Sequence, residues 1–524
     1  MFNNSTVLQH KFKLLSLYII GFLFLPLSSF SQSMFASYFY NDLRATDHKD
    51  SVHTSVFPRP QLQADIHFFK DYTGDRAEQF IPRKLFNESL IQVEKEDYQL
   101  YIDPVTNFNI GTDHTGTTWQ NTRGYFFRAN INEKVQLRSW FKENQAAPAF
   151  HIEEYIAHRK VIPGEGLARP FGDGNWDYAS AGGTIAWKVS KYFDILAGQD
   201  QNFIGQGYRS TFLGRQHLSY PFLRLQTNLW KFRYTNLYMA LQEIDPRYRL
   251  GGMNGRKYAA MHMLSWQINK KWNVSFFEAT ISQDSNRTRG LDVHYWNPII
   301  FYRPVDFSLA SPDNMLLGAA FSYADNDLTV YGQLLLDELT VSEVIAAEGY
   351  WANKWAWQLG AKYELYRENF YGLFRLETNT ARPYMYTAAS PLQNYSHYGE
   401  PLAHPLGANF KEYLAKADIY FQRWQFQLHV ALVEQGLDTN GSNWGANIWE
   451  SYRDREQDYG NNTGQGLKQQ YLNSSLKVAY IINPMNNLQV YASLFNRTVF
   501  MGEQREKGTW FGFGLSTKLF VLTN

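Results

Sequence analysis

The final stretch of the chain, residues 508–522, alternates apolar with small or polar side chains at a period of two. The mostly apolar row consists of Thr509, Phe511, Phe513, Leu515, Thr517, Leu519 and Val521. The opposite row is made mainly of glycine and polar residues. This periodicity predicts a β-strand about twice as long as the strands of soluble sheets, which is long enough to cross a bilayer at a tilt.

A strand of this kind at the end of the chain constrains everything that precedes it. In hydrocarbon, a free strand edge leaves backbone N–H and C=O groups without partners, at a cost of several kcal/mol each. The last strand must therefore pair with the first one and close the sheet. We expect an all-β protein, a transmembrane antiparallel β-barrel of about 16–18 strands, since each strand with its connection takes about 25–30 residues.

Further alternating segments occur along the chain, and connections of two kinds join them. Residues 124–131 and 135–142 form one predicted hairpin across a short polar turn, and residues 476–482 and 488–494 form another. The long polar connections are residues 143–182, 282–290, 381–412 and 435–470. Short periplasmic turns that alternate with long extracellular loops are typical of bacterial outer-membrane barrels. A soluble all-β array, which is the alternative, does not need strands of this length.

The composition agrees with a membrane barrel and excludes several other classes. Aromatic residues make up 17% of the 524 residues, an excess expected for the two aromatic girdles of such a barrel. The formal net charge is +1, which argues against a nucleic-acid partner because that requires clustered excess Lys and Arg. The chain has no cysteine, so lipid anchoring through cysteine, disulfides, thiol chemistry and cysteine-based zinc sites are excluded.

The first residues resemble an export signal. Two lysines precede an apolar run over residues 14–27, which is followed by the small residues Ser29 and Ser31. The run is shorter than the roughly 20 residues of a transmembrane helix and contains Pro26. This pattern predicts a signal peptide over residues 1–31 and an exported mature chain that begins near Gln32.

Between the signal and the barrel, residues 32–97 form a predicted N-terminal extension, and residues 98–524 form the predicted barrel. Within the extension, residues 76–96 carry apolar side chains at broadly helical spacing, namely Phe80, Ile81, Leu85, Phe86, Leu90 and Ile91. We expect a short helical element on the periplasmic side. It is either a plug or partner-docking helix, or an extension that is simply packed against the barrel.

Motifs of enzymes and metal sites do not occur in the sequence. There is no G-x-S-x-G, no phosphate-binding loop and no H-E-x-x-H. Asp337 and Glu338 are adjacent in a predicted strand, so we expect their side chains to point to opposite faces. His397, His404 and His429 share no ligand spacing, and His429 is expected to face the lumen. We therefore expect no enzymatic activity, no cofactor and no metal.

Polar side chains occupy the expected lumen face of several strands. Arg224, Gln226 and Asn228 alternate with leucines on one strand, and Arg375 and Glu377 alternate with apolar residues on another. Asp200 ends a third inward row. Two interpretations remain open for this candidate lumen network. Such donors, acceptors and nearby aromatic rings suit sugar binding, and they equally suit an internal network that stiffens the barrel.

A long segment near the C-terminus is a candidate recognition loop. Residues 441–470 contain Trp444, Trp449, Tyr452 and Tyr459 among Asn, Asp, Arg and Gly residues. The segment is too long for a simple connection, and functional residues concentrate in such loops. Exposed aromatic rings beside planar polar groups fit either a glycan or a partner protein, while a loop that caps the barrel also buries aromatic residues.

Several stretches carry a family resemblance. Residues 198–210 (GQDQNFIGQGYRS), 220–226 (YPFLRLQ), 230–238 (WKFRYTNLY) and 294–304 (HYWNPIIFYRP) are similar to the Wzi-like capsule-assembly outer-membrane family as it occurs in Bacteroidota. Later stretches look most like the RemB-type gliding-motility branch, namely residues 331–338, 353–360, 382–384 and 401–410. The resemblance runs from Arg83 to the C-terminus.

The resemblance implies an outer-membrane barrel of about 18 strands with a periplasmic helical element. It implies a non-enzymatic role at the cell surface, in surface polysaccharide attachment or in gliding motility. The partners it implies are outer-membrane lipid, surface polysaccharide and components of the gliding or type IX secretion machinery. Two alternatives remain open, an accessory barrel subunit of that machinery and a porin-like transporter. No individual sugar-binding residue can be carried over from the family.

Overall fold

The computed structural model describes residues 53–57, 78–291, 293–297, 313–439 and 441–517 of the chain. The predicted signal peptide, residues 1–31, lies outside the described residues, as do Leu519 and Val521 of the last predicted strand. Among the residues described, no helix has both the length and the apolar character needed to cross a membrane.

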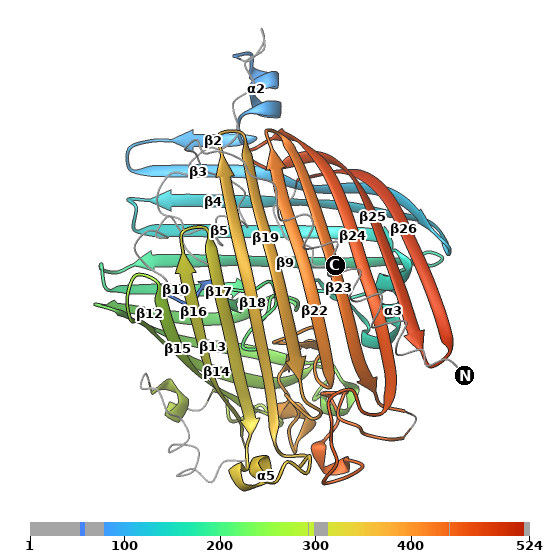
Figure 1. The fold of residues 1–524 in the computed structure, drawn as a ribbon. Coiled ribbons are helices and arrows are strands. Elements are labelled where there is room, and N and C mark those ends of the chain that lie inside the picture. The colour runs from blue at the N-terminus through green and yellow to red at the C-terminus, as the bar shows by residue number, and fades with distance from the viewer. Residues whose placement is uncertain (1–52, 58–77, 292, 298–312, 440, 518–524) are drawn as a thin grey trace.

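A single sheet closes on itself and forms the wall of the molecule (Figure 1). It contains twenty strands, of which the short strands β2 (Ile91–Glu94) and β8 (Arg169–Phe171) each pair with one neighbour only. The remaining eighteen cross the wall in antiparallel order, which confirms the predicted antiparallel barrel and its strand number. These are β3 (Tyr98–Asp113), β4 (Gly116–Ile131), β5 (Val135–Ala147), β9 (Asn175–Lys188), β10 (Phe193–Asp200), β12 (Tyr220–Leu229), β13 (Phe232–Glu243), β14 (Gly255–Gln267), β15 (Trp272–Gln283), β16 (Asn314–Asp325), β17 (Leu328–Glu338), β18 (Lys354–Arg367), β19 (Phe370–Ala381), β22 (Phe410–Phe421), β23 (Trp424–Leu437), β24 (Leu467–Asn483), β25 (Leu488–Met501) and β26 (Gln504–Thr517).

Short elements lie in the connections and in the N-terminal extension. Within the described ranges, the α-helices are α2 (Phe80–Phe86), α3 (Phe150–Arg159) and α5 (Val341–Ala346). The 3-10 helices there are η2 (Pro246–Tyr248), η3 (Val293–Trp296), η4 (Pro391–Gln393) and η5 (Tyr452–Asp454). Three two-stranded sheets pair β1 (Val56–Phe57) with β11 (Phe203–Ile204), β6 (Val161–Ile162) with β7 (Gly166–Leu167), and β20 (Ser396–His397) with β21 (Glu400–Pro401).

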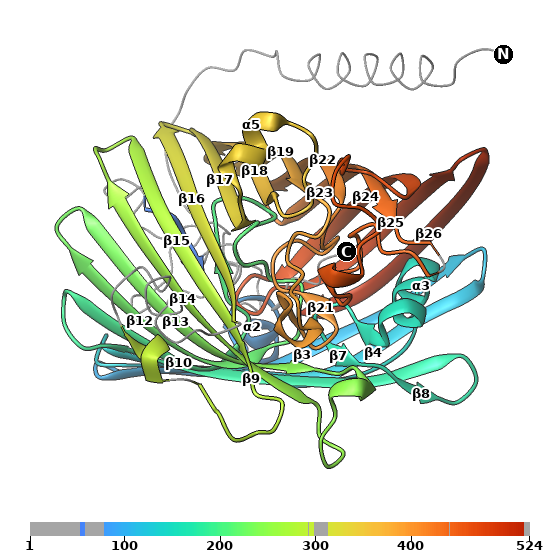
Figure 2. The same ribbon diagram turned by 90° about the horizontal axis from the view of Figure 1, so that it is seen from below.

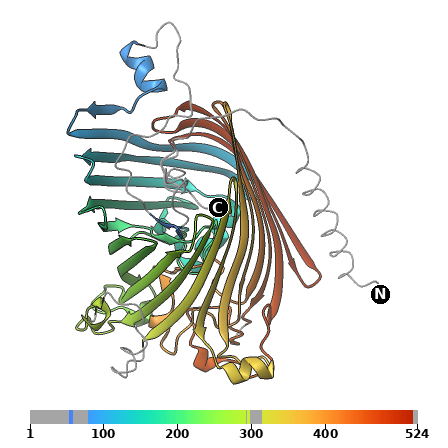
Figure 3. The same cartoon turned by 60° about the vertical axis from the view of Figure 1, so that its left-hand side comes forward.

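The barrel closes between its last and first strands, as the alternation at the C-terminus predicts (Figure 3). Phe511 lies opposite Thr112 at one end of this seam, and Ser516 lies opposite Asn107 at the other. Beyond the seam, β2 pairs with the part of the β3 edge that β26 does not reach. Thr517 joins the two stretches, because its hydroxyl accepts the Thr106 N–H at 2.8 Å.

The alternation also predicts the faces of β26 correctly. Phe511, Phe513 and Leu515 are 49%, 58% and 36% exposed on the outside of the barrel. Ser516, in the opposite row, is buried. Thr517 is wrongly placed in the outward row, because its hydroxyl bonds to the β3 backbone and is buried. The outer surface of this wall therefore offers apolar side chains, as contact with lipid requires.

The two ends of the barrel differ in the length of their connections. At the short-turn end, turns of two to four residues join the strands. At the other, long-connection end, segments such as residues 382–409 and 438–466 lie between strands. Helix α2 lies at the short-turn end, because the Asn483 amide donates to the carbonyls of Lys84 and Glu88 at 2.9 and 2.8 Å. The helix is shorter than the expected segment 76–96, since the chain turns into β2 at Ile91 to pair with β3.

Part of the N-terminal extension lies inside the barrel. Residues 53–57 are buried, and β1 pairs with β11 of the connection between β10 and β12. The Thr54 hydroxyl lies 2.7 Å from the Ser275 hydroxyl and donates to the Asn273 amide oxygen at 3.1 Å, both on β15. The extension therefore contacts the lumen wall directly.

Long connections fold into the lumen and build a core there (Figure 2). Residues 201–219 and 382–409 provide its centre, and Phe212 stacks on Phe277 of β15 at 4.5 Å between ring centroids. The lumen faces of β13–β15 are apolar where they meet this core: Leu237, Met239, Leu241, Met261, Met263, Phe277, Ala279 and Ile281. On these strands the pattern of a polar lumen face does not hold, because the lumen there is filled with protein instead of water.

The outer face of β13–β15 departs from the apolar pattern as well. Asn236, His262 and Glu278 lie directly opposite one another on the three strands. They are 3%, 0% and 1% exposed, and they alternate with the lumen-facing residues of the core. A carboxylate in the lipid face of a barrel is costly, so this sector is not in contact with lipid.

Described residues of the connection between β15 and β16 lie on this sector of the outer wall. Tyr295 packs with Tyr238 and Met315 on the outer face, and the Tyr238 hydroxyl donates to the Trp296 carbonyl at 3.3 Å. The Tyr295 hydroxyl donates to Asp313 at 2.8 Å, just before β16 begins. The protein's own chain therefore covers part of the wall that the alternation assigns to lipid.

Candidate functional site

Two regions gather the side chains that the sequence singles out. The first is the lumen, where inward connections meet the wall. The second is the long-connection end, where aromatic residues from two connections come together. Among the described residues, no group of three or more His, Cys, Asp or Glu side chains is placed to hold a metal ion.

In the lumen, Glu377 of β19 binds the inward connection 201–219. Its carboxylate accepts the backbone N–H groups of Tyr208 and Arg209, the latter at 3.1 Å. The Tyr331 hydroxyl of β17 donates to the same carboxylate at 2.7 Å, and Arg375 lies 3.9 Å away. Two predicted lumen residues, Arg375 and Glu377, therefore belong to one network, and this network anchors the connection.

Next to Glu377, Glu412 of β22 holds the connection 201–219 through the side chain of Arg209. The Arg209 guanidinium lies 3.5 Å from the Glu412 carboxylate. His404 lies 2.8 Å from that carboxylate, and the Asn379 amide donates to it at 2.9 Å. Sequence reasoning did not find Glu412 or Arg209, although Glu412 lies in an inward row with Leu414 and Lys416 that the same alternation could have shown.

The other predicted lumen residues form a second group near β10 and β12. Arg224 donates to the Asn202 amide oxygen at 3.4 Å, and the Asp200 carboxylate accepts the Gln201 N–H at 2.8 Å. Asn228 donates to the Asp194 carboxylate at 3.3 Å. Gln226 lies between Arg224 and Asn228 on the same face and is partly exposed. The six predicted residues are therefore split between two parts of the lumen.

A third buried contact joins inward connections to each other. The Glu400 carboxylate accepts the Gly164 N–H at 2.8 Å and the Leu218 N–H at 2.9 Å. These three residues come from three different connections. Burial raises the pKa of the Glu400 carboxyl to about 8, against the lowering effect of its two N–H bonds.

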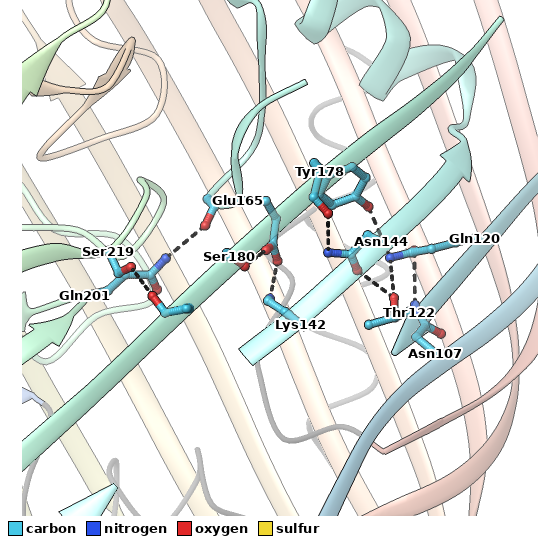
Figure 4. A network of polar contacts seen from close by, with 12 residues as sticks. Asn107, Gln120, Thr122, Lys142, Asn144, Glu165, Tyr178, Ser180, Gln201 and Ser219 are labelled. Atoms are coloured by element: carbon cyan, nitrogen blue, oxygen red, sulfur yellow. Dashed lines mark hydrogen bonds and ion pairs between the residues drawn. The ribbon is translucent and has the colours of Figure 1, made fainter. Parts of the chain in front are cut away.

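Glu165 in the same region ties the connection between β5 and β9 to the wall (Figure 4). It forms an ion pair with Lys142 of β5 and accepts the Ser180 hydroxyl of β9 at 2.6 Å. Gln201 donates to the His217 carbonyl at 2.6 Å. The polar groups of the lumen are thus used largely to hold inward connections in place.

At the long-connection end, four aromatic rings form a continuous row that we call the aromatic platform: Tyr459, Tyr350, Trp351 and Tyr452. Tyr459 lies 5.3 Å from Tyr350, and Trp351 lies 4.9 Å from Tyr452, between ring centroids. Tyr459 is 46% exposed, and the other three are half-buried. The platform therefore presents aromatic surface at the outer rim of the molecule.

Backbone hydrogen bonds between two connections hold the platform. The Trp351 N–H donates to the Asp458 carbonyl at 2.8 Å, and the Gly460 N–H donates to the Glu348 carbonyl at 2.7 Å. The Asn461 N–H donates to the Gly349 carbonyl at 2.9 Å. Residues more than one hundred positions apart in sequence are thereby fixed in one rigid arrangement.

A buried cation lies beneath the platform. Lys354 at the start of β18 is 2.9 Å from Asp337 and 3.1 Å from Glu338, and its ammonium lies 4.7 Å from the Tyr452 ring centroid. The expectation that Asp337 and Glu338 point to opposite faces is wrong, because both carboxylates lie against the Lys354 ammonium. The strand has a register shift between Leu336 and Glu338, and this irregularity brings both carboxylates to one ammonium.

Only two of the four predicted loop aromatics belong to the platform. Tyr452 and Tyr459 do, whereas Trp449 packs against the lumen core and under the Arg159 guanidinium, 3.9 Å from its ring centroid. Trp444 lies beside Gly466 at the base of the same connection. Tyr350 and Trp351 were missed, because only the folded backbone shows that their connection pairs with residues 458–461.

Comparison with known structures identifies solved proteins with a similar fold. The chain is similar to the structure described as Wzi, an outer membrane protein involved in group 1 capsule assembly in Escherichia coli and a carbohydrate-binding β-barrel. The TM-score is 0.52 at 14% identity, over 91% of this chain and 97% of that chain. The fold is that of an outer-membrane β-barrel.

Two further structures are more distant. OprD from Pseudomonas aeruginosa matches with a TM-score of 0.43 at 10% identity, over 86% of this chain and 97% of that one. OccAB4 from Acinetobacter baumannii matches with a TM-score of 0.41 at 10% identity, over 81% and 98%. No protein-family model matches the chain, and no curated protein matches it.

Proposed function

We propose that this barrel is a non-enzymatic cell-surface protein that holds polysaccharide at its long-connection end. The observation that carries the proposal is the aromatic platform, a row of four rings fixed by backbone hydrogen bonds at the rim of an outer-membrane barrel. The faces of sugar rings stack on such aromatic surfaces, and neighbouring planar polar groups bind their hydroxyls. The carbohydrate binding stated for the similar Wzi structure supports the same proposal.

The proposal requires the platform to lie outside the cell, and the lengths of the connections support this orientation. Short turns of outer-membrane barrels face the periplasm, and long loops face the exterior. The lumen contacts described above support a scaffold role over a porin-like transporter, because Glu377, Glu412 and Glu400 each hold an inward connection across the lumen. The polar lumen residues then stiffen the barrel, and the platform binds the ligand.

A narrower role in gliding motility, as an accessory barrel of the type IX secretion machinery, is the second candidate. The RemB-type resemblance of the later stretches favours it, and so does helix α5 near the platform. Val341 and Ile345 of this helix are 63% and 79% exposed. Apolar side chains exposed in a cluster at the outer end suit a protein partner better than a sugar.

The experiment that tests the proposed function replaces platform rings one at a time. Trp351→Ala and Tyr459→Ala should leave a folded, heat-modifiable barrel in the outer membrane, while the cells lose surface polysaccharide to the medium. Tyr192→Ala is the matched control, since Tyr192 is 49% exposed at the opposite, short-turn end. Full retention of polysaccharide by cells with either platform variant would contradict the proposal. Normal retention together with lost surface spreading would favour the motility role instead.

A further inference from the structure

The charges around the aromatic platform are strongly unequal. Residues 338–354 and 438–466, which carry the platform, contain eight carboxylates and three cationic side chains. The carboxylates are Glu338, Glu343, Glu348, Asp438, Glu450, Asp454, Glu456 and Asp458, and the cations are Lys354, Arg453 and Arg455. The chain as a whole is nearly neutral at +1, so this imbalance is local.

Two of the three cations are neutralised within the protein. Lys354 is fully buried between Asp337 and Glu338, at 2.9 and 3.1 Å. Arg455 pairs with Asp458 at 2.6 Å and lies over the Trp351 ring, 4.2 Å from its centroid. A site for acidic polymers normally offers Arg or Lys forks to their carboxylates or phosphates. Here Lys354 and Arg455 are paired, and Arg382 donates to the Tyr350 and Asn461 carbonyls, so Arg453 is the exposed cation of these segments.

The carboxylates act directly on the rings. The charge of Glu343 raises the pKa of the Tyr459 hydroxyl, and the charges of Glu348 and Asp458 act in the same direction. At the other end of the row, burial is the main cause that raises the pKa of Tyr452, and the charges of Glu338 and Asp337 are opposed by those of Lys354 and Arg453. The negative field is therefore concentrated at the exposed Tyr459 end of the platform. An approaching polyanion is repelled over about 8 Å at physiological ionic strength.

From this arrangement we infer that the aromatic platform selects neutral, hydroxyl-rich polysaccharide and excludes acidic polysaccharide. The inference rests on the proposed function and names its substrate class. Neutral sugar hydroxyls donate hydrogen bonds to a carboxylate such as that of Asp458, whose side chain is 56% exposed, while the sugar ring stacks on the aromatic faces. A chain that carries uronic acid or phosphate groups meets the same carboxylates as like charges.

The test uses surface polysaccharide from the producing cells, separated by anion exchange into a neutral and an acidic fraction. Each fraction is titrated onto the purified full-length barrel in detergent at low and at physiological salt. The neutral fraction should bind with an affinity that hardly changes with salt, and the acidic fraction should bind at least about tenfold more weakly at low salt. Trp351→Ala should abolish binding of the neutral fraction.

A charge variant makes the inference specific. Glu343→Gln with Glu348→Gln removes two carboxylates that do not hold the platform backbone through their side chains. This variant should bind the acidic fraction about tenfold more tightly at low salt and keep its affinity for the neutral fraction. Binding of the acidic fraction by the unchanged barrel, as tight as that of the neutral one, would overturn the inference but leave the proposed function intact. Binding of neither fraction would overturn both.

Discussion

Arg209 and Glu412 lie 3.5 Å apart in the lumen, although they are far apart in the chain. Arg209 belongs to the inward connection between β10 and β12, and Glu412 belongs to the wall strand β22. Both side chains are less than 10% exposed. The pair therefore fixes a connection across the lumen, where a transport channel would need open space.

Removing this pair should open the lumen. Glu412→Ala leaves a buried guanidinium without its carboxylate, at a cost of about 3–5 kcal/mol. We expect the connection to loosen and the barrel to conduct ions in planar bilayers, while the unchanged barrel conducts little. Glu503→Ala, at an exposed turn between β25 and β26, is the control and should not change conductance. High conductance of the unchanged barrel would revive the porin-like alternative.

The seam between β26 and β3 leaves no room for a side chain at Gly111. A Cβ atom there would lie 2.7 Å from the Phe511 carbonyl oxygen and 2.9 Å from the Thr118 hydroxyl. Gly111→Val should therefore prevent closure, and the protein should fail to show a heat-modifiable band in the outer membrane. Thr112→Val places the same side chain at the next, outward-facing and exposed position and should assemble normally. If both variants assemble equally, the seam is not closed as described.

The lipid face should reject charge where the lumen face accepts it. Phe513 is 58% exposed on the outer face of β26, so Phe513→Arg should cost about 2–4 kcal/mol and reduce assembly. Asn109 on β3 pairs directly with Gly514, a position of the lumen row of β26. Asn109→Arg should assemble with a milder loss. Urea titration of folding into lipid vesicles measures the free energy of folding of both variants. Equal losses of folding free energy would contradict the assignment of faces.

The junction at Glu400 should weaken as pH rises. Its pKa is about 8 in the folded state against an ordinary value of 4.5. Between pH 4.5 and about 8, the folded state therefore binds a proton at Glu400 that the unfolded state has lost. The stabilisation is complete below pH 4.5 and is lost as pH rises through about 8. Hydrogen exchange of residues 160–168 and 214–219, corrected for intrinsic rates, should show less protection at pH 8.5 than at pH 5. Glu400→Gln should flatten this difference, and an equal pH slope in both proteins would refute the role of Glu400.

The sequence predicts the barrel well, because alternation and strand length are local properties. The closure of β26 on β3, the outward row of Phe511 and Phe513, and the contrast of short turns and long connections all follow from backbone chemistry in lipid. The apolar lumen face of β13–β15 does not follow. Ala260 and Met261 are adjacent and both apolar. Their pattern therefore cannot show that the lumen core covers Met261 and that the connection on the outer wall covers Ala260.

The candidate sites show the same limit. Arg375 and Glu377 lie in the lumen, as their alternation indicates, but their partner Tyr208 comes from a connection whose path no local pattern gives. The platform depends on hydrogen bonds between residues 348–351 and 458–461, which are long-range contacts. Lys354 and its two carboxylates meet only because of an irregularity in β17. Local periodicity assigns faces, whereas the meeting of distant connections requires the folded chain.

The orientation of the barrel can be tested in intact cells by protease sites in exposed turns. Gly502 and Glu503 form an exposed turn between β25 and β26 at the long-connection end, and Lys191 lies in an exposed turn between β9 and β10 at the short-turn end. Because long loops of outer-membrane barrels face the exterior, a site inserted after Gly502 should be cut by added protease. A site inserted after Lys191 should be cut only after the outer membrane is permeabilised. The reverse pattern would place the aromatic platform in the periplasm, where it could not hold polysaccharide at the cell surface.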